Sequence, residues 1–338
     1  MKKETHRAYD LEFKRQAVLL ANHPDLQVQQ VAAALGIHPF MLSRWKKEMR
    51  EQRLMGEKPF GIDLAANARI NAAIARHPEV FVRCVSQFTY FPGVQRIGQM
   101  LEAGAFGRTL EVSCGFLHSS DLNPQKPINW KRKIDINGEY GCMGDLGMHV
   151  LHLPFRAGWY PRDVRAVLSN IITERPDGSG GISSCETWDN ATLFCAVPAG
   201  DDNASEFPMT IKTQRIAPGE KNNWYIEILG TKASARWSSK QANTLEVLEY
   251  TGGEQAWQVI DMGHEMTHPV ITPGIMQTGA SDAFLQMWAS FLFEMEHGHP
   301  IAEFAGCVTP QEVAASHRLF TAALRSQAER AVVALEDV

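Results

Sequence analysis

Residues 139–154 read EYGCMGDLGMHVLHLP, and this stretch contains the residues on which the prediction of function mainly rests. Glycines precede an apolar run in which Asp145, His149 and His152 are spaced at i, i+4 and i+7. On a helix this spacing puts the three side chains on one face. A carboxylate one turn from an imidazole orients the ring and favours its charged form. Asp145 and His149 are therefore predicted to form a proton-transfer pair.

Two other interpretations of the same residues stay open. An aspartate in the first turn of a helix suits the helix dipole, and His149 would then be an ordinary core histidine. A metal site made by Asp145, His149 and His152 is the weaker alternative, because no Cys or further His lies at a spacing that would complete a zinc site. We therefore expect no metal centre.

The composition indicates a soluble cytoplasmic protein with more than one domain. A length of 338 residues suits two domains and allows a large core. Residues 1–54 carry a net charge of +4, and the remainder carries −9. Six cysteines show no C-x-x-C spacing, which indicates reduced thiols. No apolar segment resembles a signal peptide or a membrane span, so we expect no membrane association.

Residues 1–54 have the pattern of a helix-turn-helix unit. Helices are predicted from Leu11 to Asn22, from Val28 to Leu35 and from Pro39 onward. A glycine, Gly36, lies at the tight turn, and the last helix is basic. Short helices with this turn and charge are typical of a helix-turn-helix DNA-binding domain.

The same segment resembles the DNA-binding region of the small transposase protein of bacterial insertion sequences. The resemblance rests on residues 9–14, 31–37 and 42–46, which read YDLEFK, VAAALGI and LSRWK. It implies that the third helix contacts DNA through Ser43, Arg44, Lys46 and Lys47. The alternative is a small three-helix domain with a solvated basic face.

Residues 55–108 alternate between helix and strand. The pattern predicts a helix from Leu64 to Arg76, a buried strand from Val80 to Val85 and a helix from Gly93 to Ala103. This alternation favours an α/β sheet.

Residues 109–338 are predicted to form a mostly antiparallel sheet with flanking helices. A first strand from Leu110 to Leu117 leads into a polar loop. Consecutive strands without intervening helices then indicate antiparallel pairing. They are predicted at Val164 to Ile172, Ala191 to Val197, Met209 to Gln214, Trp224 to Leu229, Ala233 to Trp237 and Thr244 to Tyr250. Two helices, Asp282 to Glu296 and Pro310 to Gln327, close the chain, the second behind a capping box at Thr309.

From Glu57 onward the chain resembles the glucose-fructose oxidoreductase, inositol dehydrogenase and rhizopine-catabolism (Gfo/Idh/MocA) family. The motifs occur in the family's order, and the resemblance covers about 280 of the 338 residues. They are Glu57-Lys58-Pro59, Phe91-Pro92-Gly93-Val94-Gln95-Arg96, Leu101-Glu102-x-Gly104-x-x-Gly107-Arg108, Gly144-Asp145-x-Gly147-x-His149 and Glu227-Ile228-x-Gly230-Thr231-Lys232-Ala233.

The resemblance implies an NAD(P)-dependent dehydrogenase acting on a sugar or polyol. In the family a Rossmann domain holds NAD or NADP, and a second α/β domain with an open-faced sheet completes the site and builds homo-oligomers. Lys58, between Glu57 and Pro59, would lie at the nicotinamide end of the site. Asp145 would orient substrate and histidine, and His149 would be the general base. The remaining substrate contacts would be Asn129, Trp130 and His152.

The sequence departs from the family where the dinucleotide should bind. No G-x-G-x-x-G motif occurs in the chain, and residues 1–54 replace the strands that carry it. Residues 55–108 are therefore predicted to be a remnant of the Rossmann domain, and residues 109–338 the substrate and dimerisation domain. Because no side chain accepts a hydride, we expect a truncated dehydrogenase with impaired or no hydride transfer.

Two alternatives to a truncated dehydrogenase follow from the same features. In the first, the chain binds DNA through residues 1–54, and the large domain only dimerises it. In the second, the large domain is a sensor that binds a polyol or a sugar acid near Asn129 and Trp130.

Overall fold

The computed structural model describes residues 17, 21, 27–50, 53–56, 60–200, 205–262, 266–271 and 274–338. The chain divides into two compact units. One consists of Met1–Leu54 and His77–Val82, and the other of Met55–Arg76 and Arg83–Val338. We describe each unit by itself.

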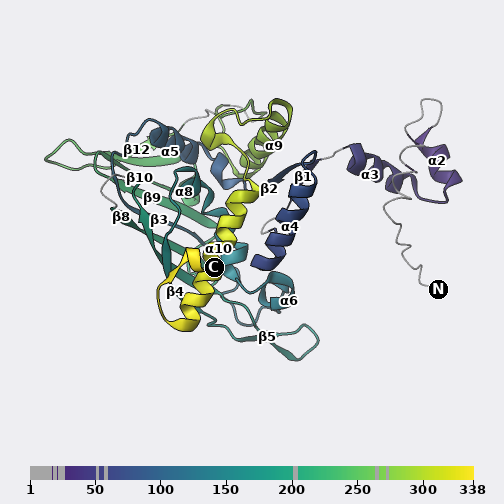
Figure 1. Cartoon of the computed structure of the whole chain (residues 1–338), viewed down its shortest axis with the longest axis horizontal. Coiled ribbons are helices and arrows are strands. Elements are labelled where there is room, and N and C mark those ends of the chain that lie inside the picture. Colours follow the sequence, from purple (N-terminus) through teal and green to yellow (C-terminus); the bar gives the residue numbers. More distant parts are fainter. Residues whose placement is uncertain are drawn as a thin grey trace. The chain divides into compact units, whose positions relative to one another are not determined.

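The first unit contains the predicted helix-turn-helix pair. Helices α2 (Val28–Ala34) and α3 (Pro39–Arg50) are joined by a turn in which Gly36 has φ +64° (Figure 1). A glycine suits this turn because the left-handed region disfavours a side chain. The two helices close over a small apolar core that includes Leu42 and Trp45. The second and third predicted helices are confirmed, and the first lies outside the described residues except for Ala17 and Ala21.

The second unit is built on a nine-stranded sheet in the order β12-β11-β10-β9-β3-β8-β7-β4-β13 (Figure 1). Its strands are β3 (Thr109–Leu117), β4 (Asp163–Ser169), β7 (Asn190–Pro198), β8 (Glu206–Gln214), β9 (Asn223–Gly230), β10 (Ala233–Ser238), β11 (Thr244–Glu249), β12 (Gln258–Asp261) and β13 (Val333–Ala334). All neighbours are antiparallel except the central pair, β3 and β8, which run parallel. The predicted fold class, mixed α/β with a mostly antiparallel sheet, is confirmed.

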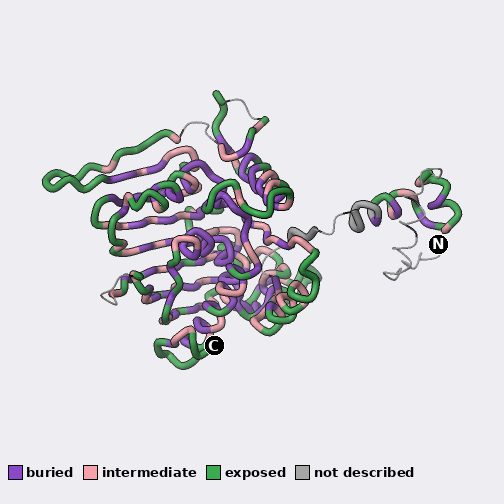
Figure 2. Tube along the Cα trace, turned by 45° about the horizontal axis from the view of Figure 1, so that its top comes forward, coloured by how far each residue is buried: buried purple, intermediate pink, exposed green. Residues whose placement is uncertain are grey.

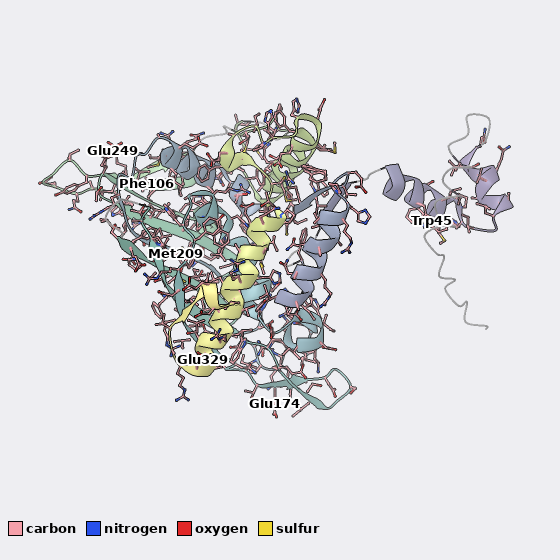
Figure 3. All side chains as sticks on the ribbon, viewed as in Figure 1. Trp45, Phe106, Glu174, Met209, Glu249 and Glu329 are labelled. Carbon is pink, nitrogen blue, oxygen red and sulfur yellow. The ribbon has the colours of Figure 1, made fainter. Side chains whose placement is uncertain are left out.

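One face of this sheet is buried, and the other is open. Figure 2 shows buried and exposed residues alternating along the strands. Along β7, Leu193 and Val197 are buried but Phe194 is 53% exposed. Met209, on β8, lies in the fully buried layer (Figure 3). The alternation shows that helices cover only one side of the sheet.

Helices α9 (Ala280–His297) and α10 (Pro310–Glu329) lie in the sequence between the sheet strands β12 and β13. The predicted capping box at the start of α10 is present, since the Thr309 hydroxyl accepts a hydrogen bond from the Glu312 amide at 3.2 Å. Near its other end, the Ser326 hydroxyl accepts a hydrogen bond from the Ala166 amide of β4 at 2.9 Å. Helix α10 is thereby fixed along β4.

The predicted Rossmann remnant forms only a small piece of sheet. Strands β1 (Arg53–Gly56) and β2 (Phe81–Cys84) pair with each other in a two-stranded sheet. Helix α4 (Leu64–Arg76) separates them, and α5 (Pro92–Glu102) follows. The predicted helices and strand of this region are confirmed to within two residues. A turn of 3₁₀ helix, η1 (Phe88–Tyr90), was not predicted.

The chain around Asp145 corrects one prediction. The prediction of a single helix that carries Asp145, His149 and His152 on one face is wrong. Helix α7 (Cys142–Asp145) ends at the aspartate, η3 (Gly147–His149) is a 3₁₀ turn, and α8 (His152–Arg156) starts a new helix. A Cβ on Gly147 would lie 2.7 Å from the Phe320 ring, so the backbone bends closely against α10 there.

Two short elements shape the polar loops beside this segment. Loop residues 129–137 form η2 (Trp130–Arg132) and α6 (Ile134–Asn137). A hairpin of β5 (Glu174–Pro176) and β6 (Ile182–Ser184) surrounds the turn predicted at residues 176–181. The Asp177 carboxylate accepts the backbone amides of that turn, which explains its composition. Short 3₁₀ turns, η4 (Ser239–Gln241), η5 (Glu303–Ala305) and η6 (Leu335–Asp337), complete the structure.

Candidate functional site

The parallel strands β3 and β8 end side by side, and the residues that follow them meet. Leu117 pairs with Gln214 in the register, and the amide of His118 donates to the Gln214 carbonyl at 2.7 Å. His118 and Arg215 therefore leave the sheet at the same edge. Neither residue was singled out from the sequence, because parallel pairing between distant strands has no local signal.

Asp145 at the end of α7 lies between two cations. The Nη2 of Arg215 makes an ion pair with Asp145 Oδ2, and the Nζ of Lys131 lies 3.5 Å from the same oxygen. Arg215 is almost fully buried, whereas the Lys131 side chain is 33% exposed. We call Asp145, Arg215 and Lys131 the Asp145 group. It joins three segments that are distant in sequence.

The charged side chains near the ends of β3 and β8 are mostly positive. Burial, followed by the charges of Arg215 and Lys131, lowers the pKa of His118. Burial and Arg215 likewise lower the pKa of Lys131, while the Asp121 carboxylate opposes that shift. His118 Nδ1 accepts the Ser120 amide at 2.9 Å. A neutral His118 therefore carries its proton on Nε2.

His149 is enclosed by aromatic side chains. Its ring is edge-on to Phe88 and Phe116 at centroid distances of 5.2 and 5.7 Å, and its carbonyl accepts the indole N–H of Trp224. The Ser86 hydroxyl lies 3.4 Å from His149 Nδ1. Only 6% of His149 is exposed. These contacts fix the orientation of the imidazole, as a base would require.

His152 belongs to a different buried cluster. Its Nδ1 lies 4.0 Å from Glu312 Oε1, and Arg156 Nε donates to the same oxygen at 2.9 Å. Burial lowers the pKa of His152 to about 4, so this imidazole is neutral at pH 7. We call His152, Arg156 and Glu312 the Glu312 group. The substrate contact assigned to His152 stays a prediction that this position does not favour.

The loop before Lys131 presents the other predicted substrate residues. Asn129 Oδ1 accepts the Lys131 amide at 3.0 Å, which orders the turn. The Trp130 ring is 50% exposed, and Lys131 Nζ lies 5.5 Å from its centroid. An exposed indole beside polar groups suits stacking against a sugar ring.

Several predicted residues cannot be placed. Glu57, Lys58 and Pro59 lie outside the described residues. Ser43 is exposed on α3, and the side chains of Arg44, Lys46 and Lys47 are not among those described. Within the described ranges, no group of three or more His, Cys, Asp or Glu side chains is arranged to hold a metal ion. No helix in the part of the chain that the structure describes is long and apolar enough to cross a membrane.

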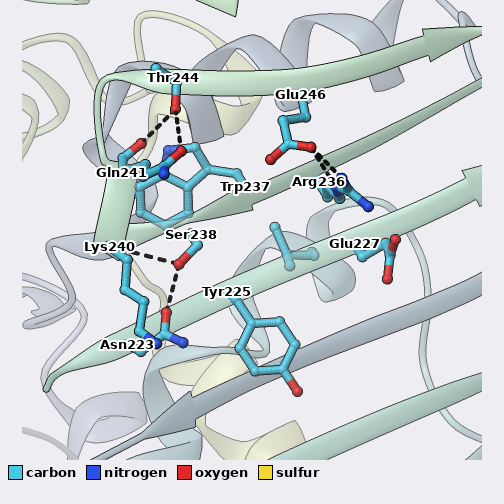
Figure 4. Close-up of a pocket in the computed structure, with 11 residues that line it drawn as sticks. Asn223, Tyr225, Glu227, Arg236, Trp237, Ser238, Lys240, Gln241, Thr244 and Glu246 are labelled. Carbon is cyan, nitrogen blue, oxygen red and sulfur yellow. Dashed lines mark hydrogen bonds and ion pairs between the residues drawn. The ribbon is translucent and has the colours of Figure 1, made fainter. Parts of the chain in front are cut away.

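A cavity of about 370 Å³ lies on the open face of the sheet, away from these residues (Figure 4). Hydrogen bonds and ion pairs cross it, such as Ser238 Oγ to Asn223 Oδ1 at 2.7 Å. Arg236 pairs with Glu246 on its wall. Charges of both signs line this cavity, and it contains none of the residues predicted from the sequence.

The described residues do not fit a dinucleotide. Phosphates bind at helix N-termini that follow strands and whose amides are free. At α4 the Asp63 carboxylate already accepts the Ala66 amide at 2.6 Å. Burial and the Asp63 charge raise the pKa of the neighbouring Glu139, so that end of α4 is acidic. At α5 a Cβ on Gly93 would overlap the Trp237 ring, so its first turn is covered.

Comparison with known proteins confirms the resemblances read from the sequence. The family model of the GFO/IDH/MocA C-terminal domain matches residues 94–236, and a transposase family model matches residues 3–70. An uncharacterized oxidoreductase of Synechocystis sp. is 26% identical over 226 residues, 64% of this chain and 55% of the relative. Levoglucosan dehydrogenase of Pseudarthrobacter phenanthrenivorans is 29% identical over 168 residues, 46% of this chain and 42% of the relative. The chain thus spans about half the length of these relatives.

A solved structure shows the same fold. Levoglucosan dehydrogenase in complex with NADH and levoglucosan aligns with a TM-score of 0.71 at 20% identity. The alignment covers 87% of this chain and 76% of that one.

Proposed function

Because this chain joins a C-terminal domain of the GFO/IDH/MocA family to a transposase-type segment, we propose that it binds a small sugar or polyol and does not transfer hydride by itself. Asp145 would position a ligand hydroxyl, and His149 would accept its hydrogen bond and, in an intact dehydrogenase, its proton. Trp130 would stack on the ring, with Asn129 ordering its loop. Lys58 would approach the same hydroxyl.

The observation that carries this proposal is the meeting of the Asp145 group with the exposed Trp130. Three segments, the loop after Asn129, helix α7 and the end of β8, bring charged side chains and an aromatic face to one edge of the sheet. Sites for small polar ligands combine a few convergent polar groups with such apolar surface. The relative crystallised with levoglucosan supports a sugar as the ligand class.

The proposed absence of hydride transfer depends on the missing dinucleotide site and not on Asp145 or His149. A general base contributes about 10²–10⁴-fold to a rate, but hydride needs the dinucleotide as acceptor. NAD or NADP is the acceptor that the family implies. The closed helix N-termini at α4 and α5 do not fit it.

Calorimetric titration of the purified full-length chain tests both the proposed sugar binding and the proposed lack of dinucleotide binding. Levoglucosan, sorbitol or myo-inositol should bind saturably, and NADH and NADPH should not. Trp130→Ala should weaken sugar binding by about tenfold, since stacking surface is lost. Trp257→Ala is the matched control, because that indole packs on Arg236 at a distant site. Turnover of a polyol with NAD, or no sugar binding by the folded chain, contradicts the proposal.

A second function, DNA binding through residues 1–54, is favoured by the α2–α3 pair and the transposase match. In this proposal Ser43, Arg44, Lys46 and Lys47 face DNA, and phosphate contacts supply most of the affinity. Fluorescence anisotropy with labelled insertion-sequence ends should show binding that weakens steeply with salt. Arg44→Ala with Lys47→Ala should weaken it, and Lys240→Ala, in the other unit, should not. Binding that is unchanged in the double variant would exclude this function.

We further propose that the open face of the sheet pairs two copies of the chain. Phe194 and Val167 are exposed there at 53% and 50%, on adjacent strands. Exposed apolar side chains on an uncovered sheet favour association. Phe194→Glu should convert a dimer to a monomer in light scattering. Ile182→Glu, on the β5–β6 hairpin, should leave it a dimer. A monomeric wild-type chain refutes the pairing.

A further inference from the structure

The Asp145 group contains more positive than negative charge. Arg215 and Lys131 share one carboxylate, that of Asp145. The adjacent pair, Lys126 and Asp121, is neutral in itself, with Nζ 3.1 Å from Oδ1. One positive charge at this edge is therefore not matched by these carboxylates.

The guanidinium charge of Arg215 is buried and is therefore not screened by water. The residue is 1% exposed, and its Nε is buried without a hydrogen-bond acceptor among the described residues. A buried guanidinium normally has its donors satisfied, since each unpaired donor costs free energy. The ion pair with Asp145 therefore compensates the buried charge of Arg215 only in part.

Lys131 and His118 supply donors nearer the solvent. The Lys131 side chain is 33% exposed, and His118 is partly exposed with its proton on Nε2. His118 follows β3 and Arg215 follows β8, two strands that end side by side, and burial, Arg215 and Lys131 lower the pKa of His118. An ammonium and an N–H backed by a buried guanidinium are suited to an oxyanion.

We propose that Lys131, His118 and Arg215 form a binding site for an oxyanion carried by the sugar-like ligand, a carboxylate or a phosphate group. This inference rests on the proposed sugar-binding function and narrows its ligand to an acidic sugar. Lys131 contacts the oxyanion, and Arg215 acts from behind it through its charge. A structural ion pair alone would need only Arg215 and Asp145, whereas Lys131 adds a second, partly exposed cation beside the same carboxylate.

Isothermal titration of the full chain with gluconate, glucose 6-phosphate and sorbitol tests the inference. Both acidic ligands should bind more tightly than sorbitol, and 0.5 M NaCl should reduce the difference. Tighter binding of gluconate identifies a carboxylate, and tighter binding of glucose 6-phosphate identifies a phosphate. Lys131→Met should weaken the acidic ligands by about tenfold or more, the loss expected for one charge-assisted hydrogen bond, and should weaken sorbitol by a clearly smaller factor.

Lys133→Met is the matched control, because it removes an equal charge from the same loop. Lys133 is also partly exposed. Equal affinity for sorbitol and for both acids would overturn the inference while leaving sugar binding intact. Unchanged acid affinity in Lys131→Met, or equal losses in both lysine variants, would also overturn it. If none of the three ligands binds to the folded chain, the inference and the proposed function both fail. Arg215→Met is a secondary variant, because its burial makes misfolding a separate outcome.

Discussion

The Asp145 group and the Glu312 group are built from the same kinds of residue but differ in what surrounds them. Each pairs one carboxylate with an arginine, and each draws a residue from the segment that follows Gly141. Around Glu312 the side chains of all three residues are at most 10% exposed, whereas around Asp145 one cation, Lys131, is 33% exposed. The difference shows that access, rather than residue type, separates a binding site from a structural ion pair.

The largest loss of stability is expected when the Glu312 group is broken. Glu312→Gln should lower the free energy of unfolding by about 3–5 kcal/mol, because Arg156 is left buried without its counter-ion. Urea denaturation of the variant measures this loss. Glu329→Gln is the control on the same helix, where the pair with Arg325 is exposed and should contribute less than about 1 kcal/mol. Equal effects in the two variants would show that the Glu312 group is not a buried charge cluster.

The next effect is a dependence of stability on pH through His152. Its pKa of about 4 in the folded chain lies below the ordinary 6.5, so the unfolded chain binds the proton first as pH falls. Stability from this group is complete above pH 6.5 and is lost on acidification, by up to about 3 kcal/mol at pH 4. Denaturant midpoints from pH 7 to 4 should fall less steeply for His152→Gln than for the wild type. Parallel curves would contradict the lowered pKa.

A smaller loss is expected when the Asp145 group is broken. Asp145→Asn should destabilise the chain by about 2 kcal/mol, since Arg215 loses its ion pair but keeps the attraction of the Asp121 carboxylate. Thermal unfolding of Asp145→Asn beside Glu312→Gln measures the contrast. A greater loss at Asp145 than at Glu312 would show that the Asp145 group is the more important of the two for stability.

The smallest effect on stability is expected for Lys131→Met. A pair with a partly exposed lysine contributes about 0–1 kcal/mol, so this variant should fold like the wild type. Circular dichroism and urea denaturation provide the check. Strong destabilisation would make Lys131 a structural residue and remove the contrast with the enclosed group.

Local pattern was sufficient to predict the fold, but not the site. Helix α4 and strands such as β9 were predicted within two residues, because apolar alternation and turn residues are local signals. The break after Asp145 was missed, since the close approach of Gly147 to Phe320 depends on a helix far along the chain. Arg215 was missed for the same reason, because its role depends on the parallel pairing of β8 with β3.

The position of β3 also has a consequence for how the molecule folds. On one side β8, β7 and β4 form an antiparallel block, and on the other β9 to β12 follow one another as neighbours. Strand β3 joins the two blocks, yet its partners on both sides lie roughly one hundred residues later in the sequence. Closing loops of that length is slow, so the two blocks are expected to form before β3 pairs with them. The site at the end of β3 and β8 would then be among the last parts to assemble, and a ligand bound there would stabilise the completed sheet.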